Sequence, residues 1–170
     1  NVERERVSKN FQAVRIMRMA EEYSAYDKFW YVHQYDFRGR MYAVTSAFSP
    51  QGPDMGKGLL EFGEGKILGE RGFWHLKVHY ANLCGYDKDV SFQQRSEYTD
   101  EKRDAIIACS KDPLGDAKHL WVDADKQYCA LAAIFELADA YILGADNVCN
   151  RIPVARDGSC NGLQHYAAVL

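Results

Sequence analysis

The sequence predicts an α+β protein that is mostly helical and contains only short strands. Apolar residues recur at helical spacing through residues 2–26 and 69–85, and residues 127–144 form a strongly apolar run. Strand-like alternation is confined to short stretches near residues 40–46 and 152–155. The chain has 170 residues, of which 47% are hydrophobic, which is enough for one globular core.

The first predicted helix covers residues 2–26. Residues 1–20 carry five basic and two acidic residues, so this helix could follow a phosphate backbone, although a solvated helix face has the same composition. Its apolar stripe comprises Phe11, Val14, Ile16, Met17, Met19 and Ala20.

Residues 29–144 are predicted to contain an aromatic-rich segment, a loop and three helices. Residues 29–62 are rich in aromatic side chains, and residues 50–58 are expected to form a loop because of their Pro and Gly content. Residues 69–85 are expected to be a helix that Gly85 ends, with Phe73, Leu76, Val78 and Tyr80 buried. One helix is predicted for residues 91–113, capped by Ser91 and ending before Pro113, and a buried helix for residues 127–144.

The overall composition excludes several classes of protein. The chain carries 21 basic and 24 acidic residues, so a role in nucleic-acid binding needs local basic patches. No apolar run is long enough to span a bilayer, and no secretory signal opens the chain, so no membrane partner is expected. The five cysteines form no C-x-x-C pair, which argues against a zinc finger and favours reduced thiols.

The segment DFRGRMYAV carries a possible anion site. In an extended backbone Arg38 and Arg40 would point to one face, and Gly39 between them would let an anion approach the backbone. Paired guanidinium groups suit phosphate oxygens, and Tyr42 could stack on a base. The alternative is a structural cluster of the arginines with Asp36.

Two lysines lie near glycines in predicted turns. Lys57 stands in GKG, which does not satisfy the P-loop pattern, and Lys88 stands in GYDKD after a predicted helix end. Either could meet a phosphate as a point charge, and either alone could be an ordinary surface lysine. His75 and His79 are spaced to share a metal, but no H-E-x-x-H glutamate is present, which favours packing or surface roles.

The segment DGSCNG has two chemical interpretations besides a helix cap by Asp157. The Asp157 carboxylate next to an accessible Gly158 carbonyl is an oxygen donor set suited to Mg²⁺, and the following helix would favour an anion. Alternatively, G-S-C-N-G matches a nucleophile elbow with Cys160 as the nucleophile of a cysteine hydrolase. His165 follows too closely for the usual order of that triad.

Several long motifs together resemble the single-subunit, phage-type DNA-dependent RNA polymerases, a family that includes mitochondrial and organellar enzymes. The motifs occur in family order and are most similar to enzymes of podovirus-type bacteriophages. They are DFRGRMYAV, FSPQGPDMGKGLLEF, GFWHLKVHYANLCGYDK, IIACSKDP and PVARDGSCNGLQHYAA.

This resemblance implies a right-hand polymerase fold with palm, fingers and thumb, and a nucleotidyltransferase that extends RNA on a DNA template. Residues 1–170 would be the start of the palm with adjoining helices. The promoter-binding part, the fingers and the rest of the palm would be missing, since Asn1 is not an initiator Met and Leu170 falls inside a predicted helix. The isolated fragment is therefore expected to be inactive.

The resemblance also assigns residues. Asp157 would be one of two aspartates that hold two Mg²⁺ ions, and the Gly158 carbonyl a further ligand. Lys88 would lie near the incoming triphosphate, and Arg40 and Tyr42 near the template and the RNA–DNA hybrid. Lys57 is a weaker candidate for contact with a strand, and Arg38 is kept as a nucleic-acid-binding candidate because of its spacing from Arg40. Arg156 precedes the catalytic position, where related enzymes can carry an apolar residue, and its role is left open.

The implied partners are template and promoter DNA, the RNA product and ribonucleoside triphosphates, handled by a monomer in the cytoplasm of an infected bacterium. Two hypotheses stand beside the polymerase. One is a cysteine hydrolase that uses Cys160, and the other is a non-catalytic nucleic-acid-binding module that does not depend on Asp157.

Overall fold

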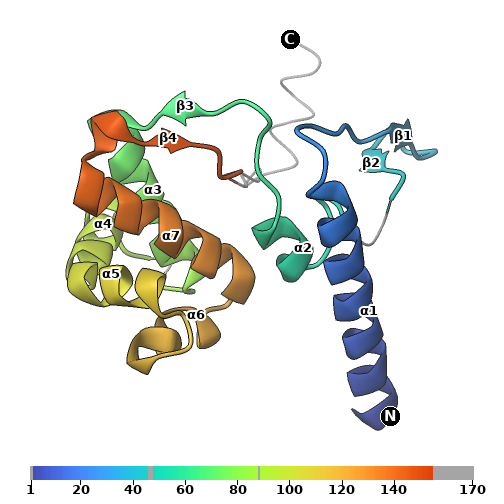
Figure 1. Cartoon of the computed structure of the whole chain (residues 1–170), viewed down its shortest axis with the longest axis horizontal. Helices are drawn as coiled ribbons and strands as arrows, with labels where there is room; N and C mark the ends of the chain where they lie inside the picture. Colours follow the sequence, from blue (N-terminus) through green and yellow to red (C-terminus); the bar gives the residue numbers. More distant parts are fainter. Residues whose placement is uncertain (1, 46–47, 88, 155–170) are drawn as a thin grey trace.

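The computed structural model describes residues 2–45, 48–87 and 89–154, which form two parts (Figure 1). The N-terminal part comprises the long helix α1, a hairpin of β1 and β2, and the short helix α2. The larger part, here called the helical module, runs from β3 to β4, residues 66–150, and contains helices α3 to α7. The predicted fold class, α+β with mostly helix and short strands, is confirmed.

Helix α1, Val2–Tyr23, confirms the first predicted helix, but its apolar residues divide into two groups. Ile16 is 1% exposed and anchors a small core with Phe48 and Leu60. Phe11, Val14 and Met17 are exposed. The partly buried side chains packed around this small core are Met19, Ala20, Tyr23, Phe29, Tyr31 and Met55.

The hairpin pairs β1, His33–Tyr35, with β2, Met41–Ala43, in antiparallel register. The strand predicted near residues 40–46 is confirmed at Met41–Ala43, whereas β1 was not predicted. The Gln51 side chain holds the open edge of β2. Its amide oxygen accepts a hydrogen bond of 2.7 Å from the Ala43 N–H, and its amide nitrogen donates one of 3.0 Å to the Met41 carbonyl.

Helix α2, Asp54–Gly58, corrects the prediction of a loop over residues 50–58. Pro53 precedes its first residue, a position where the missing N–H of proline costs no helical hydrogen bond. The helix is held from outside, because the Asp54 carboxylate accepts a 2.7 Å hydrogen bond from the Tyr128 N–H at the start of α7. Gly58 allows the close approach, since a Cβ atom there would lie 2.6 Å from the Tyr128 carbonyl carbon.

The helical module begins and ends in a two-stranded ribbon, in which β3, Lys66–Ile67, pairs antiparallel with β4, Cys149–Asn150. Between them lie α3, Gly69–Leu83, α4, Phe92–Asp100, α5, Arg103–Lys111, α6, His119–Val122, and α7, Gln127–Leu143. One 3₁₀ turn, Asp116–Lys118, directly precedes α6, and a second, Ala145–Asn147, follows α7. Because the ribbon joins residues 66 and 150, the module closes on itself.

The single helix predicted for residues 91–113 is wrong, because the chain breaks into α4 and α5 at Glu101 and Lys102. The break lets the two helices pack on different partners: α4 lies against α3, and α5 turns Ile106 and Cys109 toward α7. The predicted cap is confirmed, since Ser91 and Gln94 form a reciprocal capping box.

The core of the module surrounds α7, as predicted for residues 127–144. Small residues on α7 let α3 and α5 approach closely, and Ile134 and Leu137 are fully buried between them. On α3, Leu76, Val78 and Tyr80 are buried as predicted, whereas Phe73 is half-buried. The Tyr80 hydroxyl donates a 3.0 Å hydrogen bond to the Leu120 carbonyl, which satisfies it inside this core.

The strand predicted at residues 152–155 is wrong for residues 152–154, and Ala155 lies outside the described residues. The strand lies earlier, at Cys149–Asn150, where β3 provides the pairing partner. Pro153 lacks the N–H group that a ladder needs, so the apolar pattern of residues 152–155 does not continue the ribbon.

Candidate nucleic-acid interface

The residues predicted to form the site divide between the hairpin, α2 and segments that the structure does not describe. Arg38, Arg40 and Tyr42 lie in or beside the hairpin, and Lys57 lies in the last turn of α2 (Figure 1). Lys88, Asp157, Gly158 and Cys160 lie outside the described residues. The described part of the candidate site therefore consists of the hairpin and the surroundings of Lys57.

The turn between β1 and β2 is organised by Asp36. Its backbone N–H donates to the Arg40 carbonyl at 2.8 Å, and its own carbonyl accepts from the Gly39 N–H at 3.0 Å. Its carboxylate oxygen Oδ1 accepts from two more backbone N–H groups, those of Arg38 at 2.8 Å and Arg40 at 3.0 Å. These hydrogen bonds, led by the one from Arg40, hold the pKa of Asp36 below its usual range, so the residue is charged at neutral pH.

The expectation that Arg38 and Arg40 share one extended face is wrong. Arg38 lies inside the turn, and Arg40 directly precedes β2. Gly39 has φ of +77°, a conformation that side-chain-bearing residues rarely adopt, while the space around its Cα is open. The glycine is therefore needed for the turn itself and not for the approach of an anion.

The two arginines consequently differ in what their guanidinium groups contact. Arg38 forms an ion pair with Asp36, with 3.1 Å from Nη2 to Oδ2, and lies 5.4 Å from the centre of the Phe37 ring. This contact agrees with the structural alternative considered for the segment. The exposed Arg40 guanidinium makes no hydrogen bond or ion pair with any residue in the part of the chain that the structure describes. Arg40 is thus the arginine whose guanidinium group can donate hydrogen bonds to a phosphate.

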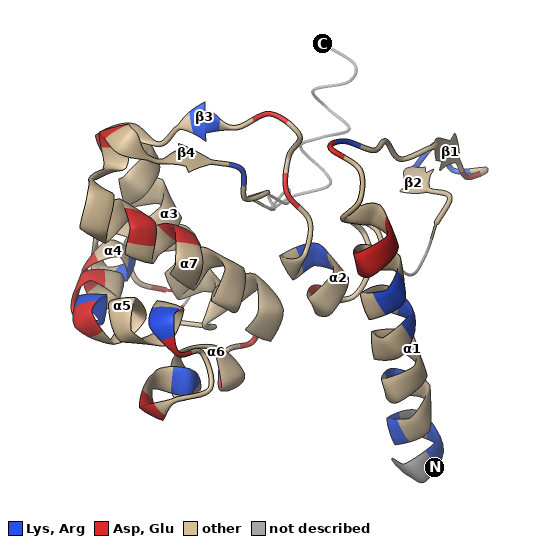
Figure 2. Cartoon of the chain, in the orientation of Figure 1, with Lys and Arg blue, Asp and Glu red and all other residues tan. Residues whose placement is uncertain are grey.

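Aromatic side chains are exposed along the hairpin and just before it. Tyr42, opposite Gln34 in the hairpin, is exposed and lies two residues after Arg40. Phe37, at the tip of the turn, is 95% exposed, and Trp30, just before β1, is 83% exposed. Sequence reasoning missed Phe37 and Trp30 as candidate stacking residues, although their place in an aromatic-rich, basic segment was a usable signal. Figure 2 shows Lys and Arg residues along α1 and in the hairpin.

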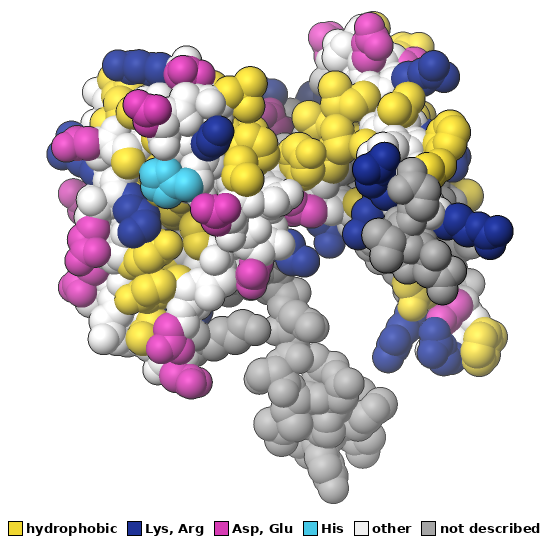
Figure 3. All heavy atoms as spheres, turned by 90° about the horizontal axis from the view of Figure 1, so that it is seen from below, with side chains coloured by type: hydrophobic (Ala, Val, Ile, Leu, Met, Phe, Trp, Pro, Cys, Tyr) yellow, Lys and Arg dark blue, Asp and Glu magenta, His cyan; other side chains and the backbone are white. Residues whose placement is uncertain are grey.

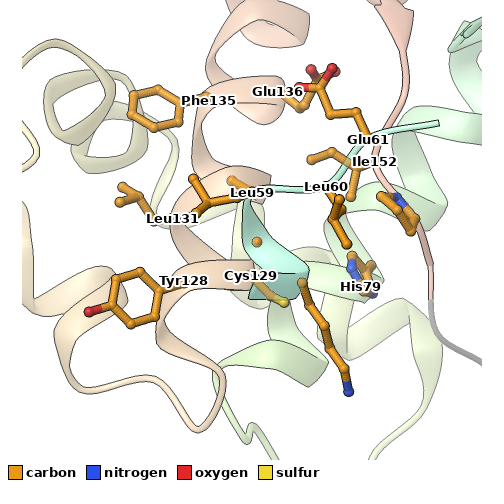
Figure 4. Close-up of a pocket in the computed structure, with 14 residues that line it drawn as sticks. Leu59, Leu60, Glu61, His79, Tyr128, Cys129, Leu131, Phe135, Glu136 and Ile152 are labelled. Carbon is orange, nitrogen blue, oxygen red and sulfur yellow. The ribbon is translucent and has the colours of Figure 1, made fainter. Parts of the chain in front are cut away.

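Lys57 lies at a pocket between α2 and α7, away from the turn (Figure 4). The pocket has a volume of about 320 Å³. At its other end stand two carboxylates, Glu61 and Glu136, and burial raises the pKa of Glu136. The Asn150 side-chain amide donates a 2.8 Å hydrogen bond to Glu136. Lys57 is exposed, so its ammonium group can meet a phosphate as a point charge.

The cysteines and histidines of the described part show packing or surface roles. Cys109 is fully buried, Cys84 and Cys129 are half-buried, and Cys149 is exposed. Among residues 2–45, 48–87 and 89–154, no group of three or more His, Cys, Asp or Glu side chains is arranged to hold a metal ion. Within the same ranges, none of the helices has the length and hydropathy that a membrane-spanning helix needs.

Known proteins match nearly the whole chain. The family model described as DNA-dependent RNA polymerase matches residues 66–170. The chain belongs to this family. It is 40% identical over 169 residues to the DNA-directed RNA polymerase of Enterobacteria phage T3, which covers 99% of this chain and 19% of that protein.

Two further relatives show the breadth of the family. T7 RNA polymerase of Escherichia phage T7 is 39% identical over 165 residues, 97% of this chain and 18% of that protein. The mitochondrial DNA-directed RNA polymerase of Schizosaccharomyces pombe is 42% identical over 144 residues, 84% of this chain and 12% of that protein. The resemblance stated from the motifs is confirmed, and the chain spans less than a fifth of the length of these polymerases.

Family membership agrees with the predicted right-hand polymerase fold. The matched range of residues 66–170 includes Lys88, Asp157, Gly158 and Cys160. The hairpin and Lys57 precede that range, but they lie within the 169 residues aligned with the phage T3 polymerase. The alignment does not assign a role to any of these residues.

Proposed function

We propose that this chain is part of a DNA-directed RNA polymerase that transfers ribonucleoside monophosphates to the 3′-hydroxyl of RNA on a DNA template. The observation that carries the proposal is the alignment of 97–99% of the chain, at 39–40% identity, with the polymerases of phages T3 and T7. No observation favours the cysteine hydrolase, whose Cys160 falls inside the range that matches the polymerase family.

We assign Asp157 and the carbonyl of Gly158 to the metal site. A carboxylate and a backbone carbonyl are hard oxygen donors, the ligands that Mg²⁺ prefers. Bound there with a second ion, Mg²⁺ would lower the pKa of the RNA 3′-hydroxyl and neutralise charge on the triphosphate. The task of Asp157 is to present its oxygens to the metal at the point where the RNA end and the nucleotide meet.

The remaining residues bind nucleic acid and nucleotide. Lys88 is assigned to the triphosphate of the incoming nucleotide, where a compact cation balances phosphate charge. Arg40 and Tyr42 are assigned to the template and the RNA–DNA hybrid, since an uncommitted guanidinium and an exposed ring suit a phosphate and a base. Arg38 supports the turn through Asp36, and Lys57 contacts a strand phosphate.

The complete enzyme would act as a monomer in the cytoplasm of an infected bacterium, on promoter DNA and ribonucleoside triphosphates. The phage relatives support a bacterial host, while the mitochondrial relatives point to an organelle as the alternative. The 170-residue chain by itself is expected to be inactive, because it spans less than a fifth of the length of its phage polymerase relatives. Mg²⁺-dependent nucleotide incorporation by the isolated chain would contradict this.

The test uses the full-length parent polymerase and follows ribonucleotide incorporation on a DNA template. Asp157→Asn keeps the shape of the side chain and a possible helix cap but removes the charge, so incorporation should fall by about two orders of magnitude or more while DNA binding persists. Asp139→Asn, an exposed aspartate on α7, is the matched control and should leave incorporation unchanged. Incorporation close to wild type in Asp157→Asn would refute the assignment.

A further inference from the structure

Helix α2 is attached to the helical module at the N-terminal end of α7. The carboxylate of Asp54, the first residue of α2, accepts a 2.7 Å hydrogen bond from the Tyr128 N–H, 74 positions later in the sequence. The Cys129 thiol donates to the backbone carbonyl of Asp54 at 3.8 Å, and Figure 4 shows Cys129 next to α2. Two consecutive residues of α7 therefore hold a single residue of α2.

Helix α7 has no cap from its own sequence at this end. The N-terminus of a helix leaves backbone N–H groups without partners inside the helix and carries a partial positive charge. The N-cap residue, Lys126, has a side chain that can only donate hydrogen bonds, and the first turn of α7 contains no acidic residue. Asp54 supplies both the missing acceptor and the negative charge. Its second oxygen, Oδ1, is buried and makes no hydrogen bond with the described residues, so the carboxylate faces the protein and not the solvent.

The candidate phosphate-binding residue Lys57 lies one helical turn after Asp54. It is exposed and stands at the pocket between α2 and α7. Burial raises the pKa of the Cys129 thiol to about 12, Asp54 adds to this rise, and the positive charge of Lys57 opposes it, so the Lys57 ammonium group is near the start of α7. A helix of five residues is not stable through its own hydrogen bonds. The place of α2 therefore depends on its contacts with α7, and Asp54 provides the direct hydrogen bonds.

We propose that Asp54 is a positioning residue, which caps α7, holds α2 against the module and so fixes where Lys57 meets a phosphate of the nucleic acid. This inference rests on the proposed function, which assigns Lys57 to a strand phosphate. Asp54 touches no nucleic acid in this arrangement and acts through the helix that carries Lys57. Its own negative charge repels phosphate, so removal of a cap should weaken binding, whereas removal of a mere charge should strengthen it.

The test uses the full-length parent polymerase. Fluorescence anisotropy measures binding of an RNA primer annealed to a DNA template at several salt concentrations. Asp54→Ala removes the cap and the charge, whereas Asp54→Asn removes the same charge but keeps an oxygen that caps a helix about equally well. Asp139→Ala, an exposed aspartate farther along α7, is the matched control. Lys57→Ala, alone and combined with Asp54→Ala, completes a double-mutant cycle.

Lys57→Ala should weaken binding by about threefold to tenfold and reduce the salt dependence by about one phosphate contact. Asp54→Ala should produce most of both changes, and the double variant should bind no more weakly than Lys57→Ala, because the two residues act on one contact. Asp54→Asn and Asp139→Ala should stay within about twofold of wild type. Amide hydrogen exchange in a peptide spanning residues 124–134 should be about tenfold faster in Asp54→Ala and unchanged in Asp54→Asn, since only the first variant loses the cap.

Wild-type affinity and salt dependence in Asp54→Ala would overturn the proposal, and so would tighter binding, which would leave Asp54 with a charge effect alone. Additive losses in the double variant would overturn it too, because Asp54 would then act independently of Lys57. The same holds for equal losses in Asp54→Asn and Asp54→Ala, since the acceptor oxygen would not be what matters. Should Asp54→Ala fail to fold, Asp54→Ser takes its place, because its shorter side chain stays polar but does not reach the Tyr128 N–H.

Failure of this inference is distinguishable from failure of the proposed function. If Lys57→Ala binds like wild type, Lys57 meets no phosphate and the positioning role of Asp54 is wrong. Incorporation by Asp157→Asn tests the polymerase assignment separately, because Asp157 belongs to the proposed metal site and not to α2. Loss of incorporation in Asp157→Asn together with wild-type binding in Asp54→Ala would mean that only the positioning role is wrong.

Discussion

The helical module and the N-terminal part bury their apolar side chains in different ways. In the module, Ile106, Ile134 and Leu137 are completely buried around α7, and the β3–β4 ribbon closes the chain on itself. In the N-terminal part, the core is small, and Phe11, Trp30 and Phe37 stand exposed. Figure 3 shows hydrophobic side chains exposed on both parts, seen from below.

This difference indicates that one part of the chain provides stability and the other provides contact surface. The module has the contacts of a self-contained folding unit, with its core drawn from helices that are near in sequence. The N-terminal part instead presents aromatic and basic side chains on a hairpin whose shape depends on hydrogen bonds to Asp36. Stability is therefore expected to depend on the module, and contact with nucleic acid on the hairpin.

The largest expected effect concerns the core of the module. Leu137→Ala should lower the free energy of unfolding of the 170-residue chain by about 2–5 kcal/mol, because it leaves a cavity against α3 and α5. Phe11→Ala, on the exposed side of α1, should change it by about 0.5 kcal/mol or less. Urea denaturation followed by circular dichroism measures both. Similar losses in the two variants would show that the N-terminal part contributes equally to stability.

The next effect concerns the junction of the two parts. At Gly58 an added Cβ would lie 2.6 Å from the carbonyl carbon of Tyr128, so Gly58→Ala must push α2 away from α7. Such overpacking should cost about 1–3 kcal/mol in the same urea experiment. Gly63→Ala is the matched control, since its Cβ would meet only the Lys28 side chain, at 3.6 Å. If both variants unfold like wild type, α2 and α7 do not pack as tightly as described.

The sequence predicted correctly those helices and caps that are determined by residues close together in the chain. The apolar run of residues 127–144 predicted α7, and Ser91 with Gln94 is a local cap. The break between α4 and α5 was missed because it depends on two different packing partners, α3 and α7. The strand at Cys149–Asn150 was placed too late because its partner, Lys66–Ile67, is about eighty residues away.

The candidate site shows the same division. The residue types at Arg38, Arg40 and Tyr42 could be selected from the sequence, but the turn conformation of Gly39 could not, so the two arginines were given one role. His79 offered no sequence signal for its place in the pocket beside Lys57. Its place in the pocket depends on α2, α3 and the segment around Ile152 coming together in space.

The smallest expected effect compares the two arginines of the hairpin in the parent polymerase. Arg40→Ala should weaken binding of an RNA–DNA hybrid by about tenfold and reduce the salt dependence by about one phosphate contact, because its guanidinium makes no hydrogen bond or ion pair with the described residues. Arg38→Ala should weaken binding less, since that guanidinium is already paired with Asp36. Fluorescence anisotropy at several salt concentrations measures both.

The pH dependence tests whether Asp36 causes this difference. The pKa of Asp36 is lowered below its usual value of 3.8, first by the hydrogen bond from the Arg40 N–H. A carboxyl group whose pKa is lowered by folding stabilises the turn above its usual pKa, and this support is lost as the pH falls through the lowered value. The gap between Arg38→Ala and Arg40→Ala should therefore stay constant from pH 5 to 8. If the gap closes within that range, a group other than Asp36 holds Arg38, and the two arginines do not have the separate roles that the turn indicates.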